Sequence, residues 1–301
     1  FARACMTPSP GSFRNAESIL FGLGPAEYVL DESTEALFRE LVARIVEQRQ
    51  PGGSHTNLFF RLAPERWLET LVTRDVRAVA SALSLEREGF QLVTAASRVQ
   101  DFYDEEAVQT FYYAETVSLL EELTGASRVV VFDHTVRRRI PGATDRAAGI
   151  PRQPVPRVHN DYTEKSGPQR VRDLLGEDAS ALLRGRFAVI NVWRPVRGPI
   201  RDAPLAVADA QSVDHDDLVA TDLIYPDRVG EIYYVKFNPS HRWFYASAMR
   251  QDEVMLIKCF DSADDGRARF VPHSAFEDPT TPAGALPRES IELRTLAFYE
   301  E

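Results

Sequence analysis

The sequence predicts an α+β fold in which a helical and mixed N-terminal part precedes a strand-rich core. Two observations carry this prediction. Residues up to about 125 contain two segments with apolar residues at helical spacing, and the chain beyond residue 157 contains five β-branched or aromatic runs bounded by turn residues. Short strands at irregular spacing, with long connections, fit a double-stranded β-helix (a jelly-roll or cupin-like core) better than a parallel α/β sheet.

The chain divides into a mixed extension, residues 1–84, and a jelly-roll core, residues 85–301, on which the extension packs. At 301 residues the chain lies near the upper limit for one hydrophobic core. We therefore expect one compact unit, with two separate domains as the alternative.

Two helices are expected before the core strands. Residues 34–48, TEALFRELVARIVEQ, place six apolar side chains on one helical face, and Pro51-Gly52-Gly53 ends that helix. A second helix should begin at Asp104 as the N-cap and end before Gly125, a residue type that favours the position just after a helix.

The remaining elements follow in order. The strand RVVVFDH, residues 128–134, comes directly after the second helix, and residues 137–157 contain four prolines, two glycines and six arginines, which is typical of a loop. A short helix is expected at PQRVRDLLG, residues 168–176. The five core strands are expected at RFAVINVW, EIYYVKF, RWFYASA, EVMLIKCF and SIELRTLAFY.

Composition excludes several classes of function. The chain has 35 basic and 45 acidic residues, so its formal net charge is 35 − 45 = −10. A chain this acidic is not expected to bind a nucleic-acid backbone. No apolar run is long enough to span a membrane. Only Cys5 and Cys259 are present, and Cys259 lies in an apolar run, which favours a buried free thiol and a reducing, cytoplasmic setting.

The stretch RVHNDYT, residues 157–163, carries the first candidate for chemistry. On an extended strand, side chains two positions apart share one face, so His159 and Asp161 can converge on one ion while Asn160 faces away. An imidazole and a carboxylate, completed by a distant second histidine, form the facial triad of non-haem Fe(II) oxygenases. The pattern alone is weak, because His215 followed by Asp217 repeats it in what reads as an acidic surface loop.

The C-terminal part supplies two further candidates. His273 lies in the stretch PHSAFEDP, and Arg288 and Ser290 follow at the start of the last predicted strand. Arg288 and Ser290 share a strand face by the same period of two, so a forked guanidinium and a hydroxyl could together bind the far carboxylate of 2-oxoglutarate. The order His159-x-Asp161, then His273, then Arg288-x-Ser290 is more specific than any one of these three motifs.

The chain resembles a family of iron- and 2-oxoglutarate-dependent oxygenases, which includes the cephamycin methoxylation component, gibberellin-desaturase-like proteins and fungal endoperoxide-forming enzymes. The resemblance extends from about residue 85 to the end. It is carried by the stretches VHNDYT, INVWRPV, PLAVADAQSV, HRWFYASAM, DEVMLIKCFDS, PHSAFEDP and PRESIELR.

The resemblance implies that His159, Asp161 and His273 hold Fe(II) and that Arg288 with Ser290 holds 2-oxoglutarate, with O2 as the second co-substrate. Two alternatives stay open. His241, in HRWFYASAM, is the alternative third ligand, and Arg294 is the alternative anchor for 2-oxoglutarate.

Four further residues are candidates at the site. Asn191 and Trp193 share a face of the strand INVW, with Asn191 expected to contact the co-substrate, and Arg194 precedes a proline expected to end that strand. Trp193, Arg194 and Tyr162 are candidates for contact with the substrate, although Tyr162 should point away from Asp161 if the strand continues. The arginines of residues 137–157 favour an anionic substrate.

The expected function is oxidation of a C–H bond in a small molecule of specialised metabolism, by hydroxylation, desaturation or oxidative cyclisation. A zinc-dependent hydrolase with the same ligands is the enzymatic alternative, and a cupin-like metal-binding module without catalysis is the other. The sequence does not identify the substrate or the oligomeric state.

Overall fold

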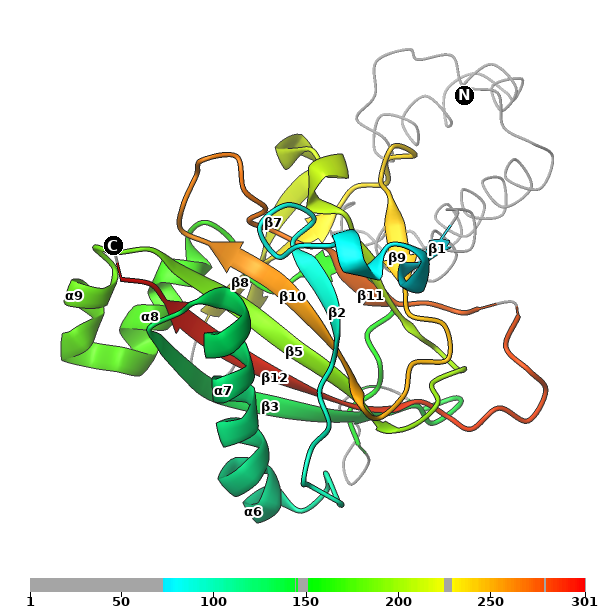
Figure 1. Ribbon diagram of the computed structural model, residues 1–301. Helices are drawn as coiled ribbons and strands as arrows, with labels where there is room; N and C mark the ends of the chain where they lie inside the picture. The colour runs from blue at the N-terminus through cyan, green and yellow to red at the C-terminus, as the bar shows by residue number, and fades with distance from the viewer. Residues whose placement is uncertain (1–72, 144, 146–150, 225–228, 279, 301) are drawn as a thin grey trace, which may run out of the picture.

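The computed structural model describes residues 73–143, 145, 151–224, 229–278 and 280–300. Within these ranges two β-sheets form the body of the protein, and the larger apolar core contains side chains from both sheets (Figure 1). The predicted helix at residues 34–48 and most of the predicted extension lie outside the described residues.

The first sheet has the strand order β2-β10-β5-β12-β3, and every neighbouring pair is antiparallel. Its central strand β5 is buried from Phe187 to Pro195 because both of its faces are covered, which explains its almost continuously apolar sequence. The strands are β2 Phe90–Thr94, β10 Glu253–Asp261, β5 Phe187–Arg197, β12 Glu289–Phe298 and β3 Arg128–Arg138.

The second sheet has the order β1-β9-β6-β11-β4-β8-β7, in which only the β1–β9 pair is parallel. Two of its central strands, β4 and β11, are very short. The strands are β1 Thr73–Asp75, β9 Trp243–Tyr245, β6 Leu205–Ala208, β11 His273–Ala275, β4 His159–Asn160, β8 Val229–Val235 and β7 Leu218–Ile224.

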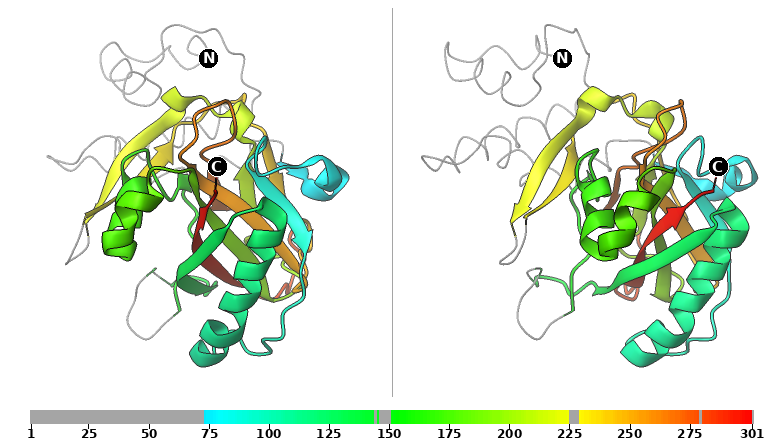
Figure 2. Two further views of the ribbon diagram at one scale, coloured as in Figure 1. Left: turned by 60° about the vertical axis from the view of Figure 1, so that its left-hand side comes forward. Right: turned by 90° about the vertical axis from the view of Figure 1, so that its left-hand side faces the viewer.

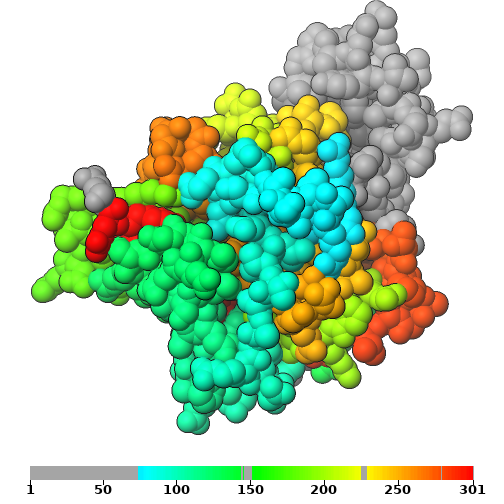
Figure 3. Space-filling model, viewed as in Figure 1, coloured from blue at the N-terminus to red at the C-terminus, as the bar shows by residue number. Residues whose placement is uncertain are grey.

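The helix predicted between Asp104 and Gly125 is confirmed. Asp104 accepts hydrogen bonds from the backbone N–H groups of Glu106 and Ala107, and Gly125 adopts a left-handed φ of 70°. The helix comprises α6 Glu105–Ala107, a π-helical turn Val108–Tyr112 and α7 Tyr113–Thr124. It packs on the outer face of the first sheet, where Leu85 of the segment before β2 belongs to the same apolar cluster (Figures 1 and 3).

The other helices are short. The predicted helix at residues 168–176 is α8 Ser166–Leu175, and it lies beside the β7–β8 hairpin (Figure 2). α9 Ala179–Leu182 follows it. Single 3-10 turns occur at Val76–Ala78, Ala80–Ala82, Gly176–Asp178, Ala210–Ser212 and His215–Asp217. None of the helices in the described ranges has the length and apolar character needed to cross a bilayer.

All five predicted core strands are present, with shifted ends. Pro195 does not end β5, contrary to the expectation, because β5 continues to Arg197 with its neighbour β12 in register on both sides of a bulge. The predicted loop after residue 137 is irregular from Arg139 onward in its described part.

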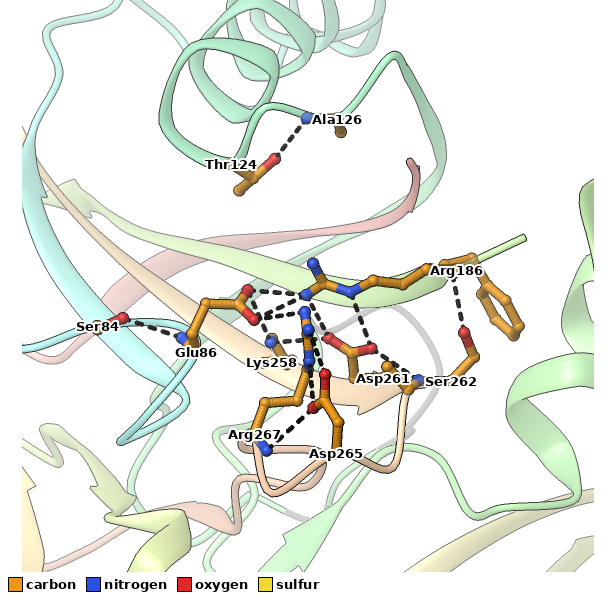
Figure 4. A network of polar contacts seen from close by, with 12 residues as sticks. Ser84, Glu86, Thr124, Ala126, Arg186, Lys258, Asp261, Ser262, Asp265 and Arg267 are labelled. Atoms are coloured by element: carbon orange, nitrogen blue, oxygen red, sulfur yellow. Dashed lines mark hydrogen bonds and ion pairs between the residues drawn. The ribbon is translucent and has the colours of Figure 1, made fainter. Parts of the chain in front are cut away.

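A buried ionic network joins the segment before β2 to the first sheet (Figure 4). The ammonium group of Lys258 and the carboxylate of Asp261 are both fully buried and lie 2.8 Å apart. Arg186 pairs with Asp261 at 2.7 Å and with Glu86 at 2.8 Å, and Glu86 also pairs with Lys258 and Arg267. The carboxylates of Glu86 and Asp261 thereby compensate the buried charge of Lys258, which would otherwise be costly.

Candidate metal centre

Two short neighbouring strands bring the candidate metal ligands together. His159 on β4 and His273 on β11 are directly paired across the antiparallel ladder, and their ring centroids lie 4.5 Å apart. Asp161 follows β4 immediately. One nitrogen of each histidine and one oxygen of Asp161 all lie within 4.8 Å of one another, which is close enough for one ion to be bound by all three.

Both imidazole rings are oriented by backbone carbonyl groups. The Nδ1 atom of His159 donates to the carbonyl oxygen of Arg157 at 2.7 Å, and Nδ1 of His273 donates to that of Val271 at 3.0 Å. These bonds fix the proton on Nδ1 and leave each Nε2 lone pair available to a metal. Burial, and to a smaller extent the proximity of the His159 imidazole, lower the pKa of His273, which favours the neutral, ligating form.

One carboxylate oxygen of Asp161 accepts hydrogen bonds from neighbouring side chains, and the other remains available to bind a metal. Its Oδ2 accepts from Nδ2 of Asn191 at 2.7 Å and from Nε of Arg294 at 3.1 Å, while Oδ1 lies 3.5 Å from Nε2 of His159. Although burial acts to raise it, the positive charge of Arg294 holds the pKa of Asp161 well below its usual range. The carboxylate is therefore ionised and presents Oδ1 as a single donor.

Asn160 faces away from the two ligands that flank it, as the strand geometry predicts. Its amide donates to the carbonyl oxygens of Tyr162 and Cys259 and accepts from the backbone N–H of Val271. The fully buried side chain thus ties the loop that carries Asp161 to the chain just before β11.

The donor set fits a ferrous ion. Two imidazole nitrogens and one carboxylate oxygen on one side of an ion form the 2-His-1-carboxylate arrangement, which leaves positions open for other ligands. The Oδ1 atom of Asn191, next to Asp161, is buried without a hydrogen-bond partner among the described residues. An unpaired acceptor of this kind is rarely left in a completed site, so its presence indicates that a further polar group belongs there.

Arg294 lies too close to the ligands to act as a distant anchor. Its guanidinium donates to Asp161, to Oδ1 of Asp133 at 2.9 Å and to Glu292 at 2.7 Å. Although burial acts to lower it, these carboxylates keep the pKa of Arg294 well above its usual value. All three sides of the guanidinium are occupied, so the alternative in which Arg294 binds 2-oxoglutarate is not supported by this geometry.

Arg288 is placed differently. It is 3% exposed, its Nε donates to Oγ of Ser290 at 3.1 Å, and Nη1 donates to the carbonyl oxygen of Ala203 at 2.9 Å. The guanidinium lies over the ring of Trp193 at 4.8 Å. No acidic side chain of the described residues pairs with it, and burial together with the charge of Arg137 lowers the pKa of Arg288 to about 9. A buried cation without a counter-ion is suited to binding an anion.

Arg137 is a residue that the sequence analysis did not single out. It is directly paired with Ser290 across the β3–β12 ladder and is 9% exposed, and its Nη1 donates to the carbonyl oxygen of Gln153. It forms no ion pair within the described residues, and burial lowers its pKa. The period of two along RVVVFDHTVRR, which puts Arg137 on the same face as Asp133 and Thr135, was the signal that could have identified it.

A cavity of about 950 Å³ opens onto the cluster. His159, Asp161, Arg294 and Arg137 contribute to its wall, together with Arg152, Arg157 and Arg170. Its rim includes Pro154, Val155 and Pro156 from the predicted loop and Leu223, Val229 and Ile232 from the β7–β8 hairpin.

Tyr162 belongs to the larger apolar core and also lines the same cavity as Asp161, so the condition under which it would point away from Asp161, a continuing strand, is not met. The reason is that β4 ends at Asn160, and the alternation of a strand does not extend to residue 162. Burial raises the pKa of the Tyr162 hydroxyl, so it stays protonated at neutral pH.

Arg194 does not reach the cluster. It lies on the opposite face of β5 from Asn191 and Trp193, where its guanidinium lies 4.9 Å from the ring centroid of Tyr112 and donates to the carbonyl oxygen of Ala95. It is therefore part of the contact between the sheet and its covering helix.

The other two histidine candidates also lie elsewhere. Nε2 of His241 bonds Oδ2 of Asp217 at 2.9 Å, beside Trp243, and His241 is not part of the ligand cluster. His215 lies in a 3-10 turn, and its neighbouring acids do not form a cluster with it among the described residues.

The family described as "Oxidoreductase/YMDC permease-like domain" matches residues 42–298. Hydroxylase/desaturase efuI of Hormonema carpetanum is 40% identical over 253 residues, which cover 77% of this chain and 84% of efuI. Fe(II)/2-oxoglutarate-dependent dioxygenase nvfI of Aspergillus novofumigatus (strain IBT 16806) is 33% identical over 262 residues, covering 82% and 92% of the two chains. Alpha-ketoglutarate-dependent dioxygenase phiK of Fungal sp. (strain ATCC 74256) is 35% identical over 222 residues, covering 71% and 79%.

The solved structures agree with these relatives. The iron and alpha-ketoglutarate-dependent endoperoxidase NvfI superposes with a TM-score of 0.69 at 33% sequence identity, covering 76% of this chain and 85% of that one.

Proposed function

The chain belongs to the family of Fe(II)- and 2-oxoglutarate-dependent hydroxylases, desaturases and endoperoxidases, and from this premise we propose that His159, Asp161 and His273 hold its iron. The protein is an Fe(II)- and 2-oxoglutarate-dependent dioxygenase. The observation that carries the proposal is the convergence of the three donor atoms within 4.8 Å, with both Nδ1 atoms and the second carboxylate oxygen already engaged.

Iron, 2-oxoglutarate and O2 together supply an oxidant strong enough to remove hydrogen from a C–H bond, with succinate and carbon dioxide as by-products. The protein's own contribution is positioning. Carbonyl groups orient the two imidazoles, and Asn191 with Arg294 orients the carboxylate of Asp161. The cavity then determines which atom of a bound substrate faces the metal.

Arg288 and Ser290 are the proposed site for the far carboxylate of 2-oxoglutarate. Arg288 is buried and cationic at neutral pH, its guanidinium has no acidic hydrogen-bond partner among the described residues, and Ser290 lies beside it. Arg137 adds a second buried cation opposite Ser290. Asn191 was expected to touch the co-substrate, but its Nδ2 donates to Asp161 and its unpaired Oδ1 only accepts, whereas 2-oxoglutarate offers no donor, so this contact is not supported.

The two sheets support a double-stranded β-helix. The chain alternates between them, from β3 in the first sheet to β4 in the second, then β5 and β6, and again from β9 to β10, β11 and β12. This alternation is the connectivity of a jelly roll, with β7 and β8 as an added hairpin. In this proposal residues 85–301 form the oxygenase unit, and β1 before them extends the second sheet.

The proposed substrate is a small molecule of specialised metabolism, and the arginine-rich cavity wall favours an anionic one. Relatives named hydroxylase/desaturase and endoperoxidase support hydroxylation, desaturation or oxidative cyclisation as outcomes. The buried free thiol of Cys259 is consistent with a reducing, cytoplasmic setting.

The proposed roles are tested by adding Fe(II) and 2-oxoglutarate without oxygen. We expect a visible charge-transfer band that is absent from the His159→Ala and His273→Ala variants and retained by His241→Ala. Admission of air should then release succinate. Tight retention of zinc without the band would instead support the zinc-dependent hydrolase. If the wild type shows neither the band nor succinate, the non-catalytic metal-binding module would be supported.

A further inference from the structure

The cavity has room for a substrate in addition to the co-substrate, whose proposed anchors Arg288 and Ser290 do not line it. Its volume of about 950 Å³ lies near the upper end of the roughly 300–1,000 Å³ usual for ligand pockets, whereas 2-oxoglutarate is a small diacid. His159 and Asp161 form part of its wall, so a second ligand in the cavity would lie against the metal ligands.

The acids of the cavity wall all have partners. Five arginines and five acids line the cavity, so complete pairing among them was possible. Asp145 pairs with Arg152 at 3.0 Å, and Arg294 forms ion pairs with both Asp133 and Asp161. The other two acids contact residues that are not arginines: Glu231 with Lys165 and Asp173 with Gln169.

Three arginines are consequently left without an acidic partner in the described part of the chain. Arg137 is 9% exposed, and the other two, Arg157 and Arg170, are only half-buried. Nη1 of Arg157 donates to the hydroxyl of Tyr234 at 3.0 Å, and its guanidinium lies 5.6 Å from that ring centroid. The guanidinium of Arg170 lies over the ring of Phe132 at 5.2 Å.

These contacts hold the two guanidinium groups in place without neutralising them. Aromatic rings and a phenol hydroxyl restrict the side chains, so fewer rotamers are lost when an anion binds. Arg157 comes from the chain just before β4, and Tyr234 pairs directly with His159 in the β4–β8 ladder. Arg157 therefore stands next to a proposed metal ligand, and Arg170 faces the same cavity from α8.

Part of the cavity lining is apolar. Val229 is 66% exposed although it is aliphatic, and it lines the cavity beside Ile232 and Leu223 of the hairpin. Pro154, Val155 and Pro156 provide a second apolar surface on the rim. An exposed valine and half-buried aliphatic and proline side chains, in a cavity that also carries unpaired arginines, favour a ligand that combines an apolar body with an anionic group.

We propose that the substrate oxidised by this enzyme is an apolar carboxylic acid whose carboxylate is bound by Arg157 and Arg170 while its apolar body lies against the hairpin and residues 154–156. This inference rests on the proposed function. It assigns to Arg157 and Arg170 a role in specificity that is separate from the binding of iron and of 2-oxoglutarate.

The test uses the full chain loaded with Mn(II) and saturating 2-oxoglutarate. Binding of 2-naphthoate and of its neutral analogue 2-naphthamide is measured by isothermal titration calorimetry. We expect the carboxylate to bind at least about tenfold more tightly than the amide, the difference typical of one charge-assisted hydrogen bond. The double variant Arg157→Gln/Arg170→Gln should bind both probes equally weakly.

Arg172→Gln is the matched control, because Arg172 is an exposed arginine on the same helix that does not line the cavity. It should keep the full preference for the carboxylate. Equal binding of the two probes to the wild type, or an unchanged preference in the double variant, would each overturn the inference.

Titration of 2-oxoglutarate into the same Mn(II)-loaded proteins separates this inference from the proposed function. We expect equal affinity in the wild type and in the double variant. A double variant that no longer binds 2-oxoglutarate would show that these arginines serve the co-substrate, which overturns the inference and leaves the dioxygenase intact. A wild type that binds no 2-oxoglutarate would instead contradict the proposed function.

Discussion

Arg294 and Asn191 lie directly opposite each other in the ladder between β12 and β5, and both donate to the same oxygen of Asp161. Two strands of the first sheet therefore position a carboxylate that is carried by a loop of the second sheet. The orientation of Asp161 depends on the register of β5 against β12 as much as on its own backbone.

Replacing Arg294 by methionine should destabilise the metal-free protein more than the metal-loaded protein. The guanidinium is the shared cation of three carboxylates, those of Asp161, Asp133 and Glu292. Its loss should lower the free energy of unfolding by about 3 kcal/mol. A bound divalent ion replaces part of that positive charge. Denaturant unfolding with and without Mn(II) measures the difference.

Asn191→Ala is the comparison for this variant, because it removes the other donor to Asp161 without removing a charge. We expect a smaller loss of stability, about 1 kcal/mol, that is similar with and without Mn(II). Equal losses from Arg294→Met in both states would show that its charge does not act through the metal ligand.

His273 and His241 are the two candidates for the third metal ligand, and replacing each of them should have different effects on metal affinity and on stability. His273→Ala is expected to lose most of its affinity for Fe(II) or Co(II), because one of three protein ligands is removed. His241→Ala is expected to bind the metal as the wild type does but to unfold at a lower temperature, since His241 is 6% exposed and bonded to Asp217. Metal titration followed by thermal unfolding checks both outcomes, and the reverse pattern would exchange the two assignments.

Arg288→Ala should raise the 2-oxoglutarate concentration needed for half-maximal succinate formation. Its removal would leave the far carboxylate buried without a cation, at a cost of roughly 3 to 5 kcal/mol in binding. Ser290→Ala should have a smaller effect in the same direction, because it removes one neutral donor. If the Arg288→Ala enzyme needs no more 2-oxoglutarate than the wild type does, Arg137 would become the candidate for binding the far carboxylate.

Lys258→Met should destabilise the fold in a pH-dependent way. Although burial acts to raise it, the bonds from Arg186 and Lys258 lower the pKa of Asp261. Because its folded-state pKa is below the unfolded value of about 3.9, this carboxylate stabilises the fold fully above pH 4 and loses that effect as the pH falls further. The variant should therefore be less stable by about 3 kcal/mol at pH 7, with a smaller difference near pH 3.

Lys165→Met provides the control for this prediction, because the Lys165 side chain is 80% exposed. Its effect on the free energy of unfolding should be within about 0.5 kcal/mol at both pH values. A constant difference between the wild type and Lys258→Met from pH 7 to pH 3 would show that the pairing with Asp261 contributes little.

The sequence predicted those parts of the site that depend on one strand at a time. A period of two places Asn191 with Trp193, and it places Arg288 beside Ser290. The same rule could have excluded Arg194, but Pro195 was expected to end the strand. The strand instead tolerates the proline at a bulge, so the alternation continues and Arg194 faces the covering helix.

Features that depend on two strands at once were not predictable. The contact of Arg294 with Asp161 requires the register of β12 on β5 and the position of the loop after β4. The strands that carry the histidines, β4 and β11, are only two and three residues long and have no alternating pattern of their own. Their pairing is determined by long-range contacts, as is the burial of Arg137.

The cavity has two walls of different construction. Its inner side consists of β3 and β12, paired along most of their length, whereas its outer rim consists of a proline-rich connection and the end of a hairpin. β12 is paired on both sides, with β5 and with β3, whereas the rim residues of the hairpin are paired only between β7 and β8 at the end of the second sheet. Exchange of the rim between homologues should therefore be an effective route to engineered enzymes that accept new molecules while the metal ligands and the contacts that orient them stay in place.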